Sequence, residues 1–352
     1  MKRLFFFIIC FWLTIVSCNN TLKYNISFEG DFVDSEHNET IYLDMLPCFF
    51  DSIPLSPLSC CFLDSLFIVG ENFNQVTTGF FKVYKNDKLV SQFGEIGNGA
   101  NDFEIPFLNS KGKLERGFFY ISGSKFCKLS IDSVDFKVKQ SQLPMPDDFF
   151  LVNYVLNYND SSIVVSQTGD YQLRRYDKNT KSITNYNYYN ESGWFSNIPN
   201  FNLTMQLFSS SCSSNNKYIV IAYQYLKMID IISLNDMSLH KRICFQNYDV
   251  NDYEVDNKGN ISFDNEKVIN FFTYVTAGED RFYALGWDCT TEDASSGKVL
   301  STIYEFDYDG NIIKKYKPNV SITSFAIRGN EIYSIVFDQI QKEKIICKGT
   351  LQ

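Results

Sequence analysis

A short apolar run recurs six times along this chain of 352 residues, and its spacing is the feature that most constrains the fold. The runs are Leu66–Val69, Phe118–Ile121, Ile163–Val165, Tyr218–Ile221, Phe282–Leu285 and Ile332–Ile335. Their first residues are separated by 52, 45, 55, 64 and 50 positions. Runs of Ile, Val, Phe and Tyr broken by Asn, Asp, Gly and Ser are typical of β-strands. One four-stranded blade of a β-propeller needs roughly 40–50 residues, so the spacing predicts one blade per run.

A second, amphipathic run follows each of these six. The partners are Phe80–Tyr84, Lys125–Asp132, Tyr171–Asp177, Leu226–Ile232, Ser301–Tyr308 and Glu343–Cys347. Ala, the strongest helix former, occurs only six times. The sequence therefore predicts an all-β chain that folds as a six-bladed β-propeller. A seven- or eight-bladed propeller is the alternative, and a β-sandwich pair or an irregular two-domain β protein remains open if the spacing is set aside.

The last predicted blade is short of one strand, because the chain ends at Gln352. An N-terminal segment, Tyr24–Phe28 or Thr40–Leu43, is expected to supply it and to remove an exposed sheet edge. The longest step between runs contains the polar, acidic stretch Asn247–Asn270, which predicts an extended loop.

The first twenty residues have the features of an export signal. Lys2 and Arg3 precede an uncharged, mostly apolar run from Leu4 to Val16, which is too short to span a bilayer core of about 30 Å. The run ends at Ile15-Val16-Ser17-Cys18, which resembles a bacterial lipobox. That resemblance implies cleavage between Ser17 and Cys18 and lipidation of Cys18. An ordinary signal peptide with an incidental Cys18 is the alternative.

The domain boundaries follow from that resemblance. Residues 1–17 are the signal peptide, 18–23 a lipidated tether and 24–352 a single propeller domain. The full chain has 32 basic and 41 acidic residues; loss of Lys2 and Arg3 leaves 30 against 41, a formal charge of −11. Such a surface argues against nucleic-acid binding and is repelled by anionic headgroups. Membrane attachment is therefore expected through the lipid, and no transmembrane helix is predicted.

Cysteine and histidine offer few candidates for chemistry. Eight Cys follow Cys18, with no Cys-x-x-Cys pair, and Cys127, Cys244 and Cys347 lie in apolar runs. We expect these to be small buried hydrophobes, although disulfides are open to an exported protein. His37 and His240 are the only histidines. No metal site and no cofactor is predicted.

The stretch from Phe93 to Phe103, FGEIGNGANDF, resembles a phrase of exported six-bladed propellers of the TolB-like and NHL-like kind. Their phrase has Phe-Gly, spaced Gly residues and a final acidic-Phe pair; here Ala100 stands where Pro is usual. With the lipobox, the chain is similar to Bacteroidota lipoproteins grouped as TolB-like six-bladed propellers of unknown function. The resemblance implies the fold and no activity.

The candidate site residues all lie on predicted connections between strands. Glu95 and Asp102 are acidic residues of the Gly-rich phrase, and Trp194 beside Phe195 is a candidate sugar-stacking platform. A structural connector and a core aromatic are the simpler interpretations. Arg174-Arg175 could meet an acidic ligand, but strand alternation points the two side chains to opposite faces.

Two classes of function remain. The first is an envelope-anchored binding or scaffold lipoprotein for a glycan, a peptide or an envelope partner. The second is a hydrolase or lyase with carboxylate, Tyr or His240 groups at the mouth of the central channel. No catalytic motif is present, so we expect the first. The expected location is the outer membrane facing the periplasm, with surface exposure as an alternative.

Overall fold

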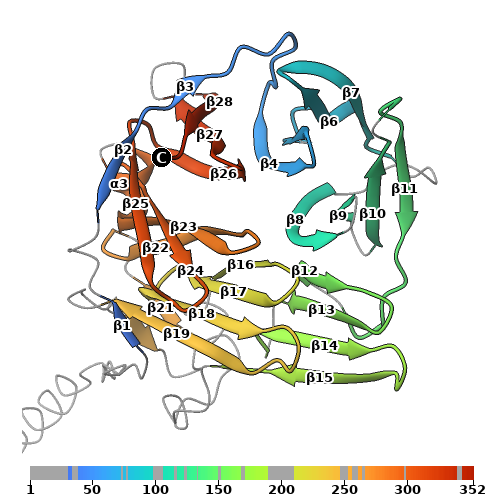
Figure 1. The fold of residues 1–352 in the computed structure, drawn as a ribbon, viewed down its shortest axis with the longest axis vertical. Helices are drawn as coiled ribbons and strands as arrows, with labels where there is room; N and C mark the ends of the chain where they lie inside the picture. Colours follow the sequence, from blue (N-terminus) through green and yellow to red (C-terminus); the bar gives the residue numbers. More distant parts are fainter. Residues whose placement is uncertain are drawn as a thin grey trace, which may run out of the picture.

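The computed structural model describes residues 31–33, 39–72, 74–76, 78–97, 106–114, 117–122, 125–132, 134–149, 152–167, 171–188, 210–245, 253–255, 261–263, 266–296, 299–338 and 343–352. Within this part of the chain, six sheets of four or five strands stand in a ring (Figure 1). Each sheet is one blade of a β-propeller, which confirms the predicted fold class.

The first three blades are formed by consecutive strands. The first consists of β4 (Pro57–Leu63), β5 (Leu66–Glu71), β6 (Thr78–Lys85) and β7 (Lys88–Glu95). The second consists of β8 (Pro106–Leu114), β9 (Gly117–Ser122), β10 (Lys125–Ile131) and β11 (Val138–Gln142). The third consists of β12 (Val152–Tyr158), β13 (Ser162–Gln167), β14 (Leu173–Asp177) and β15 (Ser182–Tyr186).

The last three blades each take one more strand from the N-terminal segment. The fourth contains β16 (Ser210–Ser214), β17 (Tyr218–Tyr223), β18 (Met228–Ser233) and β19 (Leu239–Phe245). The fifth contains β22 (Ile269–Ala277), β23 (Arg281–Thr290), β24 (Thr302–Asp307) and β25 (Ile312–Pro318). The sixth contains β26 (Ile322–Arg328), β27 (Glu331–Asp338) and β28 (Glu343–Thr350).

The first strand of every blade faces the centre of the ring. Contacts run from β4 to β8, then to β12, β16, β22 and β26, and from β26 back to β4. The ring is therefore continuous, and the first and sixth blades are neighbours although they lie at opposite ends of the sequence (Figure 1).

Every apolar run identified in the sequence is the second strand of a blade, namely β5, β9, β13, β17, β23 and β27. This strand pairs on both edges, and neighbouring blades cover its two faces, so both side-chain orientations are apolar. Val69, Ile219 and Ile335 are fully buried, which fits this position. The six partner runs overlap the third strands, so the predicted repeat is confirmed.

The closure of the ring differs in detail from the prediction. Thr40–Leu43 does form a strand, β2, but it pairs parallel with β25 and extends the fifth blade. The strand that completes the sixth blade is β3 (Leu46–Pro47), which pairs antiparallel with β28. The assignment of Thr40–Leu43 to the last blade was wrong, because the chain meets the fifth blade before it reaches the sixth. Tyr24–Phe28 lies outside the described residues.

The N-terminal segment thus follows the outside of the ring. β1 (Asp31–Val33) pairs parallel with β19 of the fourth blade, before β2 and β3 reach the fifth and sixth. We call β1, β2 and β3 the N-terminal strap. It places a further strand on the outermost strand of three consecutive blades, as Figure 1 shows along one side of the ring.

The connection between the fourth and fifth blades contains a strand pair of its own. β20 (Tyr253–Val255) and β21 (Ile261–Phe263) are antiparallel partners within the stretch expected to be a plain loop. A short helix, α3 (Thr291–Ser295), links β23 to β24, and the Thr290 side chain caps it by accepting from the Asp293 amide. Among the described residues, no helix has the length and apolar character needed to cross a membrane.

The eight cysteines after Cys18 are free thiols. Seven of them are buried, including Cys127, Cys244 and Cys347, which confirms that these are small apolar core residues. Cys48 is the half-buried exception.

Candidate functional site

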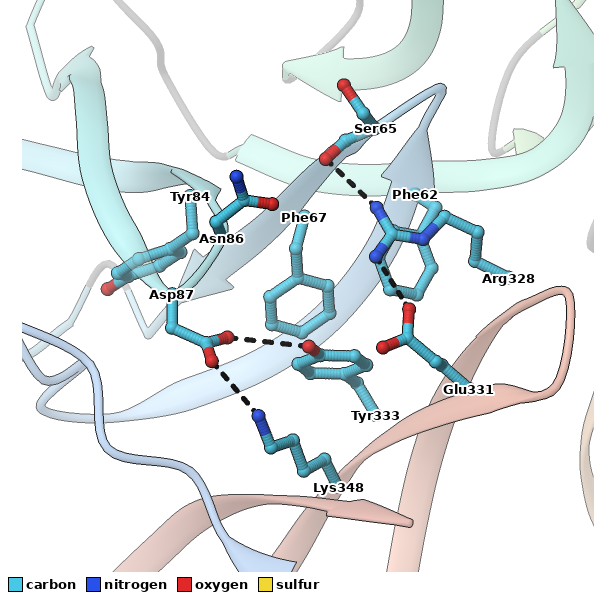
Figure 2. A pocket seen from close by; sticks show the side chains of 10 residues that line it. All are labelled: Phe62, Ser65, Phe67, Tyr84, Asn86, Asp87, Arg328, Glu331, Tyr333 and Lys348. Carbon is cyan, nitrogen blue, oxygen red and sulfur yellow. Dashed lines mark hydrogen bonds and ion pairs between the residues drawn. The ribbon is translucent and has the colours of Figure 1, made fainter. Parts of the chain in front are cut away.

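A pocket of about 230 Å³ opens where the first and sixth blades meet (Figure 2). We call it the seam pocket. The first blade contributes residues from the β4–β5 and β6–β7 turns, and the sixth contributes residues from the β26–β27 turn and from β28. These turns all lie at one end of the ring, because every second connection of an antiparallel sheet returns to the same side. The pocket is lined by aromatic and charged side chains, namely Phe62, Phe67, Tyr84, Asp87, Arg328, Glu331, Tyr333 and Lys348.

Aromatic rings form the floor of the seam pocket. The ring of Tyr333 lies 4.6 Å from that of Phe67 and 5.3 Å from that of Phe62, which it meets edge-on. Phe67 and Tyr84 are almost completely buried. Burial is the main cause that raises the pKa of Tyr333, with Asp87 adding to it. The phenol therefore stays protonated at neutral pH and serves as a hydrogen-bond donor.

One side of the pocket is organised by the carboxylate of Asp87. Its Oδ2 accepts from Nζ of Lys348 at 3.0 Å, and its Oδ1 accepts from the phenol of Tyr333 at 3.4 Å (Figure 2). The hydrogen bond to Asp87 raises the pKa of Lys348. Two residues of the sixth blade are thus joined to one carboxylate of the first.

On the other side, Arg328 links the same two blades. Its Nη2 donates to the carboxylate of Glu331 at 2.6 Å, and its Nη1 donates to the Ser65 carbonyl at 3.0 Å (Figure 2). The guanidinium also lies over the ring of Phe62, 4.7 Å from its centre. Both cations of the pocket are consequently paired with a carboxylate, and the pocket presents both signs of charge with no excess of either.

The position of Asp87 follows from local sequence. Asn86 and Asp87 are the two residues between β6 and β7, and both have positive φ, 51° and 62°. Two-residue hairpins of this kind favour Asn and Asp because these residues tolerate the left-handed region. An Asn-Asp pair between two strand-like runs is therefore a sequence pattern that predicts a hairpin turn. Nothing in the sequence indicated that this turn would face Lys348, 261 residues away.

The seam pocket offers a ligand aromatic rings for stacking and charged groups for hydrogen bonding. Burial raises the pKa of the nearby Cys48 thiol to about 12, so little reactive thiolate exists at neutral pH. No cluster of three potential metal ligands occurs among the described residues. Paired charges over aromatic rings suit a small polar ligand with donors, acceptors and an apolar face.

The site residues expected from the sequence are not part of this pocket. Glu95 is exposed at the last position of β7, whereas Asp87 directly precedes the first, so they lie at opposite ends of that strand. Asp102, Trp194, Ser17 and Cys18 lie outside the described residues.

Two other expectations can be compared with the structure. His240 is on β19, an outer strand of the fourth blade, with its ring 5.1 Å from that of Tyr218. The proposed position at the channel mouth was wrong, since β16 is the strand of this blade that faces the centre of the ring. Arg174 and Arg175 do point to opposite faces. Arg174 bonds to the Asp148 carbonyl, and Arg175 bonds to the Asn235 carbonyl of the fourth blade.

Comparison with known proteins supports the ring geometry. The model of a family described as TolB-like 6-blade propeller-like matches residues 52–330. A protein from Bacteroides fragilis described as exported has a similar structure, with a TM-score of 0.54, 10% identity, and coverage of 91% of this chain and 99% of that one. At this identity, the similarity shows the fold alone.

Two further structures are more distant. BamB from Moraxella catarrhalis has a TM-score of 0.35, 9% identity, and coverage of 83% of this chain and 69% of that one. A luciferin-regenerating enzyme has a TM-score of 0.45, 11% identity, and coverage of 88% and 95%. We infer nothing about function from either. No curated protein matches the sequence at a significant level.

Proposed function

This chain belongs to the TolB-like family of six-bladed propellers, and we propose that it is a lipid-anchored binding module of the cell envelope. In this proposal the seam pocket binds a sugar residue of a glycan. The ring holds the pocket rigid, and the ligand does not undergo reaction.

The observation that carries this proposal is the composition of the seam pocket. Aromatic rings offer a flat apolar face, while paired carboxylates and cations offer fixed acceptors and donors around it. A sugar ring has the matching surfaces, C–H groups on a face and hydroxyls at the edge. The volume of about 230 Å³ suits one ring-sized group rather than a large cofactor.

The test of binding is a glycan array screened with the full-length chain in detergent, followed by titration of the best ligand. Asp87→Asn removes the charge that holds Lys348 and Tyr333, and we expect it to weaken binding roughly ten- to hundredfold. Glu95→Gln is the matched control, because this exposed carboxylate lies at the other end of the strand that follows Asp87. Equal affinities of the two variants, or a failure of every glycan to bind, would overturn the proposal.

The same preparation tests the alternative of a hydrolase or lyase. A bound glycan recovered unchanged after long incubation supports a binding module. Cleavage of that glycan, lost on changing one carboxylate, would establish the enzyme instead.

Attachment to the membrane is the second part of the proposal and rests on the lipobox-like end at Ser17-Cys18. Stable anchoring takes more than one acyl chain, and a bacterial lipoprotein cysteine usually carries several. Metabolic labelling with an alkyne fatty acid should mark the wild type, and Cys18→Ala should abolish the label and release the protein from the membrane fraction. An unlabelled wild type would refute the anchor and leave the pocket proposal intact.

A further inference from the structure

A second pocket, of about 450 Å³, lies between the third and fourth blades. We call it the cationic pocket. Its lining comes from the β12–β13 turn and Arg175 of the third blade, and from the β16–β17 and β18–β19 turns of the fourth. These are the same kinds of turn that form the seam pocket, so the two cavities occupy equivalent positions between different pairs of blades.

The equivalence extends to single residues. Arg175 is on the third strand of its blade, as Lys348 is, and Asn235 is in the turn between third and fourth strands, as Asp87 is. In the seam pocket the ammonium of Lys348 forms an ion pair with the carboxylate of Asp87. In the cationic pocket Nη1 of Arg175 donates to the backbone carbonyl of Asn235 at 3.0 Å, an uncharged acceptor.

The lining of the cationic pocket contains two basic residues, Arg175 and Lys217, and no acidic one. Among the described residues, no carboxylate lies within ion-pair distance of Lys217. The remaining side chains are chiefly amides and hydroxyls, including Asn157, Asn216 and Ser161. In a chain with a formal charge of −9, this pocket gathers two basic side chains among polar groups, with no acidic residue in its lining.

Several acidic residues occur near these turns but do not line the pocket, among them Glu279, whose backbone carbonyl accepts from the Asn215 side chain. The carboxylate of Asp177 accepts from the backbone amides of Asn179 and Thr180, and that of Asp236 accepts from Ser238. Asp160 interacts electrostatically with Lys178, whose ammonium donates a hydrogen bond to the Asn159 carbonyl. The hydrogen bonds of Asp177 and Asp236 stay within their own turns. Asp177 also interacts electrostatically with Arg175, but it forms no ion pair with the guanidinium, unlike Asp87 with Lys348 in the seam pocket.

We propose that the cationic pocket binds an acidic sugar, with its anionic group between Arg175 and Lys217 and its hydroxyls on the surrounding amides and serines. Arg presents a planar set of donors that matches a carboxylate, and Lys adds a second positive charge. The volume of about 450 Å³ is sufficient for a sugar-sized molecule. This site is separate from the seam pocket and prefers a different ligand, because the seam pocket has no net charge.

The experiment is isothermal titration of the full-length chain in detergent with galacturonate, with galactose as the neutral probe. We expect galacturonate to bind, galactose to bind much more weakly, and the affinity for galacturonate to fall as NaCl is raised. Titrations with inorganic phosphate and sulfate separate a general oxyanion site from a carboxylated sugar site. Tighter binding of phosphate than of galacturonate would overturn the assignment to an acidic sugar.

The variants locate the site. Arg175→Gln should weaken galacturonate binding roughly ten- to hundredfold, because it removes a hydrogen-bonded charge. Arg174→Gln is the matched control on the opposite face of the same strand, and it should leave the affinity unchanged. Asn235→Asp introduces the carboxylate that the seam pocket has, and it should abolish binding by neutralising Arg175. Equal affinities of Arg175→Gln and Arg174→Gln would refute the proposal.

The galacturonate measurements are independent of the seam pocket. Asp87→Asn should leave galacturonate binding unchanged, whereas it weakens the ligand of the seam pocket. Circular dichroism and the melting temperature of each variant show whether it has folded. If Arg175→Gln fails to fold, the affinity of Asn235→Asp decides the question, because Asn235 lies on an exposed turn where a substitution is tolerated.

Discussion

Asp230 and Arg242 form a bidentate ion pair inside the fourth blade, with Nε to Oδ1 at 2.7 Å and Nη2 to Oδ2 at 2.8 Å. Asp230 is fully buried, and the hydroxyl of Tyr223 donates to the same Oδ2 at 2.8 Å. Nη2 of Arg242 also donates to the Tyr188 carbonyl, which follows the last strand of the third blade. The pair therefore joins two neighbouring blades as well as two strands.

Removing one partner of this ion pair should be costly. Asp230→Asn leaves the guanidinium of Arg242 without its counter-charge, and we expect a loss of about 3–5 kcal/mol in the free energy of unfolding. Urea unfolding followed by circular dichroism measures it. Replacing both residues, Asp230→Leu with Arg242→Met, should cost less than the single change, and a double variant less stable than Asp230→Asn would contradict this account.

The contact between the first and sixth blades should depend on its aromatic cluster. Phe67 is 4% exposed and packs against Phe50 and Tyr333, whereas Phe49 is 89% exposed. Phe67→Ala should therefore lower the free energy of unfolding by about 3–5 kcal/mol. Phe49→Ala should change it by no more than about 0.5 kcal/mol. Similar losses from both, measured by urea unfolding, would show that the cluster does not hold the ring closed.

The protein should lose stability at alkaline pH. Burial raises the pKa of Cys289 and Cys347 to about 11 and that of Tyr154 and Tyr283 to about 12. A group whose pKa is higher in the folded than in the unfolded chain stabilises the fold fully below its unfolded pKa, and that contribution disappears as the pH rises toward the folded value.

For the thiols, this range extends from the ordinary value of 9.0 to about 11. The free energy of unfolding, measured in urea at a series of pH values, should fall across this interval. The double variant Cys289→Ala with Cys347→Ala should show a shallower fall. A constant or rising stability between pH 9 and 11 would rule the explanation out.

Gly94 should resist replacement more than Gly329 does. Both have positive φ, 101° and 59°, but an added Cβ at Gly94 would lie 2.6 Å from the ring of Phe80, whereas nothing lies within 4 Å at Gly329. Gly329→Ala should cost about 1–2 kcal/mol from backbone strain. Gly94→Ala adds a clash in a packed core and should cost about 1–3 kcal/mol more. Equal melting temperatures for the two variants would contradict the role of Phe80.

The sequence was informative where a strand is buried on both faces. The runs at Leu66–Val69 and Ile332–Ile335 are visible because a central strand between two blades needs apolar residues at every position. β1 and β3 have three and two residues, too few for any periodic pattern, so the path of the N-terminal strap could not be predicted. The seam pocket could not be predicted from the sequence either, because Asp87 and Lys348 come into contact only when the ring has closed.

The N-terminal strap has a mechanical consequence. A force applied to the N-terminal end is transmitted first to β1 on the fourth blade, then to β2 on the fifth, and only then to β3, whose short pairing with β28 completes the ring. Two parallel strand pairings must therefore be pulled away before the weakest link carries any load. Tension on this end of the chain is borne by the fourth and then the fifth blade, and the join between the first and last blades is shielded from it until both pairings have separated.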